Sequence, residues 1–156
     1  MSDRASAPAI AFGFRGEDVN YRRHGRTLSV TFTWIAGPRL HPGGITRWSD
    51  GSPLTDEDKS SVFRDILQFI ASEGERPTVV INVDDESKAL WEATCSANAS
   101  LINAVEYTSD DEEHAREREM YLSSLRAGRE LSVDGVEIRD EHDLDDVMNR
   151  RRRRSR

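Results

Sequence analysis

The chain contains few of the residues that mark several common classes of protein. It has one cysteine, Cys95, among 156 residues, so no internal disulfide or cysteine-based metal cluster can form. We expect this thiol to be buried as a small apolar side chain. No apolar run is long enough to span a bilayer, and residues 1–9 contain Asp3 and Arg4, unlike a secretory signal. We therefore expect a cytoplasmic protein that does not contact membranes.

Sequence patterns of catalysis and cofactor binding are also scarce. The four histidines lack the spacings of three or four residues that commonly bring metal ligands together. Gly43-Gly44 is not followed by the glycine–lysine pair of a phosphate-binding loop, and no serine occupies a Gly-x-Ser-x-Gly turn. We therefore predict a protein that is not an enzyme and that holds no metal and no cofactor.

Charge is distributed unevenly along the chain. The formal net charge is −7, but six arginines, 150–154 and 156, lie at the C-terminus. Without them 16 basic residues face 29 acidic ones, a net charge of −13 for residues 1–149. The acidic body favours a basic protein partner, whereas the arginine tail favours nucleic acid. An equally weighted alternative is that the tail neutralises the acidic residues just upstream, which are Asp140, Glu141, Asp143, Asp145 and Asp146.

Periodicity predicts strands and a helix in the first half. Apolar and hydroxyl residues alternate over Thr27–Ile35, which indicates a half-buried strand, and a turn cluster separates it from a short strand over Ile45–Trp48. We expect these two to form a hairpin. Thr55 and Asp58 resemble a capping box before a helix from about Asp56 to Gly74. Ile10–Phe14 would be at most a marginal edge strand.

The second half reads as alternating strands and helices. The β-branched run Thr78–Val83 suits a central strand, and the order strand, helix, strand permits a parallel crossover. Asp134-Gly135 is a favoured hairpin turn. The predicted elements are a helix over Glu86–Ala97, a strand over Leu101–Tyr107, a helix over Asp110–Arg126 with a Met120, Tyr121 and Leu125 stripe, a hairpin over Glu130–Ile138, and a short helix over Asp143–Arg154.

These elements predict an α+β fold. We expect a small mixed sheet, made of the N-terminal hairpin plus central strands, packed against two to four helices, with disordered ends. Residues 1–15 would be a flexible segment, and 16–149 one domain, with a subdivision near residue 84 as an alternative. Residues 150–156 would form a disordered arginine-rich tail.

Two acidic or aromatic sites are the candidates for binding a partner. Asp84-Asp85-Glu86 follows the central strand, where α/β sheets often place ligands, although capping of the next helix is the more common role of such residues. Trp48 precedes the Asp50-Gly51 turn and is either an interface anchor or, more commonly, a core residue. The candidate partner-binding residues are thus Trp48, Asp50, Asp84, Asp85 and Glu86. The alternative nucleic-acid-binding residues are Arg150, Arg151, Arg152, Arg153 and Arg154.

One segment carries a family resemblance. Gly25-Arg26-Thr27-Leu28 and Trp48-Ser49-Asp50-Gly51-Ser52-Pro53-Leu54-Thr55, with the helix and strand that follow, resemble bacterial immunity proteins of polymorphic toxin systems over residues 20–83. The resemblance implies a cytosolic antidote that lays an acidic surface over the basic active site of a toxin. The arginine tail and the chain after Asp84 depart from the family pattern.

Three functions follow from these observations. The leading hypothesis is a non-catalytic, immunity-type inhibitor that binds a basic protein partner, such as a toxin, through acidic surface. The alternative is a nucleic-acid-associated plasmid or phage accessory protein that uses the arginine tail. A metal enzyme built on Asp84 and Asp85 is the third, and it lacks the further carboxylate and lysine or histidine that such a site needs. The oligomeric state is not predicted.

Overall fold

The computed structural model describes residues 7–13 and 16–154, and it divides into two compact units, Met1–Thr108 and Ser109–Arg156. We call these the N-terminal and C-terminal units. They replace the single domain predicted over 16–149. The boundary also does not fall near residue 84, because the strands before and after that position pair with each other in one sheet.

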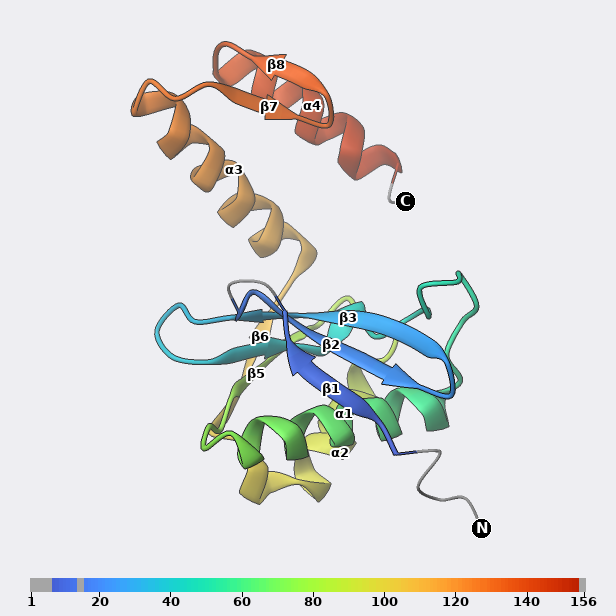
Figure 1. The fold of residues 1–156 in the computed structure, drawn as a ribbon. Helices are drawn as coiled ribbons and strands as arrows, with labels where there is room; N and C mark the ends of the chain where they lie inside the picture. Colours follow the sequence, from blue (N-terminus) through green and yellow to red (C-terminus); the bar gives the residue numbers. More distant parts are fainter. Residues whose placement is uncertain (1–6, 14–15, 155–156) are drawn as a thin grey trace. The chain divides into compact units, whose positions relative to one another are not determined.

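The N-terminal unit is built on a mixed six-stranded sheet, which confirms the predicted α+β fold. Its strands are β1 (Ala9–Phe12), β2 (Asp18–Arg23), β3 (Arg26–Thr33), β4 (Arg39–His41), β5 (Thr78–Asn82) and β6 (Ala104–Thr108), in that order across the sheet. The first four strands pair antiparallel, and β4, β5 and β6 pair parallel. Helices α1 (Asp56–Ser72) and α2 (Lys88–Ala97) lie together against one face (Figure 1). Two short 3-10 helices are η3 (Pro42–Gly44) and η4 (Ala99–Leu101).

Alternation in the strands and the stripe on α1 produce the core. Leu28, Val30 and Phe32 of β3 are buried, as the period-two pattern predicts. The buried stripe of α1 also matches the expected spacing and consists of Val62, Phe63, Ile66, Leu67 and Ile70. The Thr55 side chain accepts a hydrogen bond from the backbone N–H of Asp58, so the predicted cap of this helix is present.

The predicted hairpin between Thr27–Ile35 and Ile45–Trp48 is wrong. β3 pairs with β2 on one side and β4 on the other, while residues 45–48 contribute only the isolated bridge between Arg47 and Pro53. The true partner, β2, was missed because just two apolar residues, Val19 and Tyr21, alternate within its charged sequence. Pro42-Gly43-Gly44 forms η3 instead, and this turn carries Ile45 into the core.

The sheet begins inside the segment predicted to be flexible. Ala9–Phe12 forms β1, paired with β2 and located at the edge of the sheet, which corrects the flexible segment 1–15 for these residues. The edge position agrees with the marginal edge strand expected at Ile10–Phe14. Residues 7, 8 and 13 of that segment are described but lie outside β1, and residues 1–6 and 14–15 lie outside the described residues.

The C-terminal unit is a separate α-β-β-α arrangement. It consists of α3 (Asp110–Arg126), β7 (Leu131–Val133), β8 (Val136–Ile138) and α4 (Glu141–Arg154). Asp134 and Gly135 have φ of 52° and 79°, the left-handed values of the predicted two-residue hairpin turn. The core of this unit comprises Leu122, Val133, Ile138, Leu144, Val147 and Met148.

Two predictions for this unit need correction. Met120, expected in the buried stripe of α3, is 58% exposed, and Leu122 is buried in its place. Arg150–Arg154 continue α4 rather than forming a disordered tail, and residues 155 and 156 lie outside the described residues. Of the helices that the structure describes, none combines the length and the apolar character needed to cross a membrane.

Candidate binding surfaces

Asp85 has a structural role at the start of α2. One carboxylate oxygen accepts the backbone N–H of Ser87 at 2.8 Å, and the other accepts Nε1 of Trp91 at 2.9 Å. Trp91 is only 1% exposed, so this carboxylate satisfies a buried donor. Among the described residues no group of three or more histidine, cysteine, aspartate or glutamate side chains is placed to hold a metal ion. Asp85 therefore supports the turn before α2 and a buried indole, and the N-cap residue of α2, Ser87, makes no side-chain capping hydrogen bond.

The start of α1 and the turn before α2 each carry three consecutive acidic residues. Lys59 of α1 donates from Nζ to Oγ of Ser87 at 2.9 Å, which joins the first turns of α1 to the turn before α2. Asp84 and Glu86 are exposed in that turn. We define the acidic surface by six residues: Asp56, Glu57, Asp58, Asp84, Asp85 and Glu86. The sequence predicts Asp84, Asp85 and Glu86 as binding residues, whereas Asp56 and Asp58 mark only the start of a helix and Glu57 carries no prediction, because nothing local links the two segments.

Trp48 is a core residue rather than an exposed anchor. It is 7% exposed, its ring centroid lies 6.3 Å from that of Tyr21, and the guanidinium carbon of Arg26 lies 5.9 Å above it. The exposed tryptophan is Trp34, at 47%, whose Nε1 donates to the carbonyl of Gly16. The predicted period-two strand pattern therefore ends before Trp34.

A cleft of about 500 Å³ lies beside Trp48. It is formed by the tip of the β2–β3 hairpin, by the loop that carries Trp48 and by the first turns of α1. The residues that line this Trp48 cleft are Arg23, His24, Arg26, Trp48, Glu57, Asp58, Ser61 and Val62. Two of them, Glu57 and Asp58, also belong to the acidic surface, so the two features adjoin.

Polar contacts hold the Arg23 side of the cleft in place. Nη1 of Arg23 donates to Oγ of Ser61 at 3.0 Å and lies 3.7 Å from a carboxylate oxygen of Asp65. Asp65 also accepts the Tyr21 hydroxyl at 2.8 Å, and burial together with that carboxylate raises the pKa of Tyr21 to about 12. The Arg23 guanidinium is therefore tied to α1 through one of its nitrogens.

Two buried donors belong to residues that line the cleft. Nε of Arg23 and Nε1 of Trp48 are buried, and neither has a hydrogen-bond partner within the part of the chain that the structure describes.

Asp50 does not line the cleft. The hydroxyl and backbone N–H of Ser52 lower the pKa of Asp50, with a smaller Coulombic contribution from Arg26. Of the predicted partner-binding residues, only Trp48 lines the cleft.

The arginines of α4 are engaged within the C-terminal unit. Arg151 forms a bidentate pair with Asp134, at 3.1 Å from Nε and 2.8 Å from Nη2, and also binds Glu117. Arg152 pairs with Asp111. Arg150 lies 3.9 Å from Asp146. The tail thus neutralises acidic residues as one hypothesis expected: Arg151 and Arg152 pair with residues of α3 and the hairpin, and Arg150 pairs with Asp146 of the stretch just upstream.

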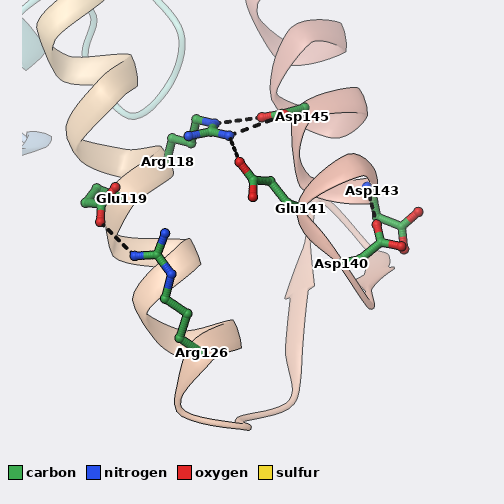
Figure 2. Close-up of polar contacts among 7 residues, drawn as sticks. All are labelled: Arg118, Glu119, Arg126, Asp140, Glu141, Asp143 and Asp145. Carbon is green, nitrogen blue, oxygen red and sulfur yellow. Dashed lines mark hydrogen bonds and ion pairs between the residues drawn. The ribbon is translucent and has the colours of Figure 1, made fainter.

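A second arginine links the two helices of the C-terminal unit. Arg118 of α3 reaches the carboxylates of Asp145 and Glu141 on α4, with Nε of Arg118 at 2.7 Å from Asp145 (Figure 2). Arg118 lowers the pKa of Asp145, and Arg151 lowers the pKa of Asp134. Electrostatic contacts therefore connect α4 to both α3 and the hairpin.

Pairing in α4 changes where the acidic charge of the chain resides. The C-terminal unit has 14 acidic residues and 11 arginines, and the N-terminal unit has 15 acidic and 11 basic residues. The net charges are therefore −3 and −4. Much of the negative charge inferred for residues 1–149 is offset by the arginines of α4, which belong to the same unit as many of those acidic residues. Neither unit therefore has a large net charge, and local clusters of charge decide what each unit attracts.

Comparison with known proteins does not identify the chain. No model of a known protein family matches it, and searches of curated proteins and of solved structures also found no match. The resemblance to immunity proteins over residues 20–83 stays a prediction. Three features of the structure bear on function: the acidic surface, the Trp48 cleft and the arginines of α4.

Proposed function

We propose that this chain is a non-catalytic binding protein, of the immunity or antitoxin type, which inhibits a basic protein partner by covering it with the acidic surface. The observation that supports this most directly is the hydrogen bond between Lys59 and Ser87, which joins the start of α1 to the turn before α2, the two segments that carry the acidic triplets. Such clusters steer a basic partner during encounter and speed association, more than they add to final affinity.

The members of the acidic surface contribute differently to this function. Glu57 and Glu86 are exposed, one from each triplet, and are available to a partner. Asp85 instead holds Trp91 and Ser87, so its role is to support the surface. The adjoining Trp48 cleft adds concave shape, which gives a protein partner somewhere to insert a side chain.

Nucleic-acid binding through α4 is the weaker candidate. Arg150, Arg153 and Arg154 are exposed, but Arg151 and Arg152 already pair with carboxylates of the same unit. Phosphate contacts by those two side chains would have to displace intramolecular ion pairs. A filter-binding assay with duplex DNA at low salt tests this alternative, which requires that Arg153→Gln/Arg154→Gln reduces retention.

The proposed function is tested by recovering a partner and then neutralising charge at two places. Affinity capture from the source cells, followed by mass spectrometry, should return a basic protein that is released as salt rises. With that protein purified, Glu57→Gln/Glu86→Gln should slow association by about tenfold, because these carboxylates steer the encounter.

A matched control separates position from net charge. Glu73→Gln/Glu75→Gln changes the net charge by the same amount at the other end of α1, away from the acidic surface. It should leave the association rate within about twofold of the unmodified protein. Equal slowing by both pairs, or capture that returns no basic protein, would contradict the proposal.

A further inference from the structure

Strand β1 lies at the edge of the six-stranded sheet and, among the strands that the structure describes, pairs with β2 alone (Figure 1). We propose that its outer side pairs with β1 of a second copy of the chain, antiparallel across a two-fold axis, so that two six-stranded sheets join into one. The partner is then the same surface of the same protein. This inference goes beyond the proposed function and does not use the acidic surface.

Backbone groups on the outer side of β1 are directed away from β2. The N–H of Gly13 donates to the carbonyl of Asp18 at 2.8 Å, so these two residues form a hydrogen-bonded pair that continues the β1–β2 ladder. Antiparallel ladders alternate such pairs with pairs whose N–H and C=O groups point the other way. Ile10 and Phe12 therefore direct their N–H and C=O groups outward. An edge of this kind is a template for another strand.

The two edges of the sheet differ in their protection against association. Charged side chains and proline commonly keep edge strands from pairing with other chains. The opposite edge, β6, carries Glu106, and Glu92 and Lys88 lie at the hydroxyl and the ring of its Tyr107. β1 has the sequence Ala-Ile-Ala-Phe and carries no charge. Pairing of β1 with its own copy therefore meets no like-charge repulsion within the strand.

Within the described strand, one symmetric register uses all the outward backbone groups. Pairing Ile10 with the partner's Phe12 forms four backbone hydrogen bonds and places Ala11 opposite its own copy. A register centred on Ile10 would instead set Phe12 against Pro8, which has no N–H. On the face that packs against α1, the half-buried Ile10 then meets the half-buried Phe12 of the partner, an apolar cross-strand pair.

The other face of the sheet pairs opposite charges in the same register. Ala9 lies beside Arg22 of β2, and the Asp18 carboxylate occupies the space that a β-carbon on Gly13 would take. Because Ala9 lies opposite the partner's Gly13, the exposed Arg22 extends toward the partner's Asp18 over residues without long side chains. The two-fold axis repeats this arrangement, so two pairs of opposite charge flank the small residues at the centre.

Sedimentation velocity of the full chain is the first test. Because an interface limited to one short strand is small and its dimer weak, concentrations from about 1 μM to about 1 mM are needed. The sedimentation coefficient should rise from that of a monomer to that of a dimer. A monomer at every concentration overturns the proposal, and so does growth beyond the dimer, because a two-fold interface closes on itself.

Charge at position 11 tests the register. Ala11 is exposed in the single chain, so a long side chain is accommodated there, whereas in the dimer two copies of it would face each other. Ala11→Lys and Ala11→Glu should each weaken dimerisation at least about tenfold. An equimolar mixture of the two should dimerise again, because lysine then faces glutamate. Mixtures that stay monomeric, or a dimer unaffected by either substitution, would overturn the proposed pairing.

A matched variant and the outer amides complete the test. Ala104→Lys makes the same substitution at an exposed position on the opposite edge strand and should dimerise within about twofold of the unmodified protein. Melting temperatures of dilute samples control for folding. Exchange of the Ile10 and Phe12 amides should slow at least about tenfold in the dimer. Unchanged exchange in a dimeric sample, or equal weakening by Ala104→Lys, overturns the assignment. All variants keep the acidic surface, so the basic-partner proposal succeeds or fails separately.

Discussion

Asp85 shows how one acidic side chain can look like a binding residue and act as a support. Asp85→Ala would remove the acceptor of both Ser87 N–H and Trp91 Nε1, leaving an indole donor buried without a partner. We expect a loss of about 1–3 kcal/mol in the free energy of unfolding, the usual cost of such a group. Urea denaturation followed by tryptophan fluorescence measures it.

The neighbouring residue supplies the control for that substitution. Glu86→Ala removes the same charge from an exposed position in the same turn and should change the unfolding free energy by no more than about 0.5 kcal/mol. Asp85→Asn, whose amide oxygen can still accept one hydrogen bond, should fall between the two. If the Asp85→Ala and Glu86→Ala proteins had the same free energy of unfolding, the hydrogen bond from Trp91 to Asp85 would not contribute to stability.

The aromatic residues show what residue type alone can and cannot tell. Tryptophan is most often buried, and that rule is correct for Trp48 and Trp91. It fails for Trp34, which continues the alternation of β3 in sequence but lies after the last paired residue, Thr33. The Trp48 cleft could not be predicted, because its walls come from a hairpin, a loop and a helix that only tertiary structure brings together.

Helix α4 depends on its arginines for attachment to the rest of the C-terminal unit. Arg151→Gln would break the contacts with Asp134 and Glu117, which join α4 to the hairpin and to α3. Because these pairs are partly exposed, we expect the C-terminal unit to lose about 1 kcal/mol in free energy of unfolding. Hydrogen exchange of α4 amides, resolved by NMR, should accelerate accordingly.

Arg153→Gln is the matched substitution on the same helix. It makes the same charge change at an exposed position and should alter exchange by an amount equivalent to less than about 0.5 kcal/mol. A disordered tail would instead make the two variants indistinguishable. Equal exchange in both variants would therefore favour the tail interpretation over the helix described here.

Elements with strong local signals were predictable, and elements defined by partners were not. The starts of α1 and α3 follow from Thr55 and Ser109, whose side chains accept the backbone N–H three residues later. The β7–β8 turn follows from Asp134-Gly135. β2 and β4 escaped detection because short, charged strands depend on neighbours for burial, and sequence periodicity does not report neighbours.

The helical arginine run shows the same limit for electrostatics. Five adjacent arginines repel one another, and that local effect alone predicts fraying. The described helix persists to Arg154 because carboxylates from α3 and the hairpin, distant in sequence, lie beside Arg151 and Arg152. Charge patterning along the chain therefore identified the need for counter-ions and did not identify which residues supply them.

Because the chain divides into two units, we expect a fall in pH to destabilise one unit before the other. Arg151 lowers the pKa of Asp134 and Arg118 lowers the pKa of Asp145 in the C-terminal unit, whereas in the N-terminal unit the pKa values of Asp50 and Glu92 are lowered mainly by the neutral donors Ser52 and Tyr107. A carboxyl whose folded pKa is depressed stabilises the fold above its unfolded pKa, about 3.9 for aspartate, and that stability is lost as pH falls through the folded pKa. The small core of this unit leaves it more dependent on such contacts than the N-terminal unit.

We therefore expect the C-terminal unit to unfold at a higher pH than the N-terminal unit as a solution is acidified below about pH 4. The three tryptophans all belong to the N-terminal unit, so their fluorescence follows that unit alone, while amide NMR signals of α4 follow the other. Added salt should raise the pH at which the α4 signals are lost, because exposed ion pairs are screened. Coincident loss of α4 signals and native fluorescence, at every salt concentration, would show that the chain unfolds as one cooperative unit.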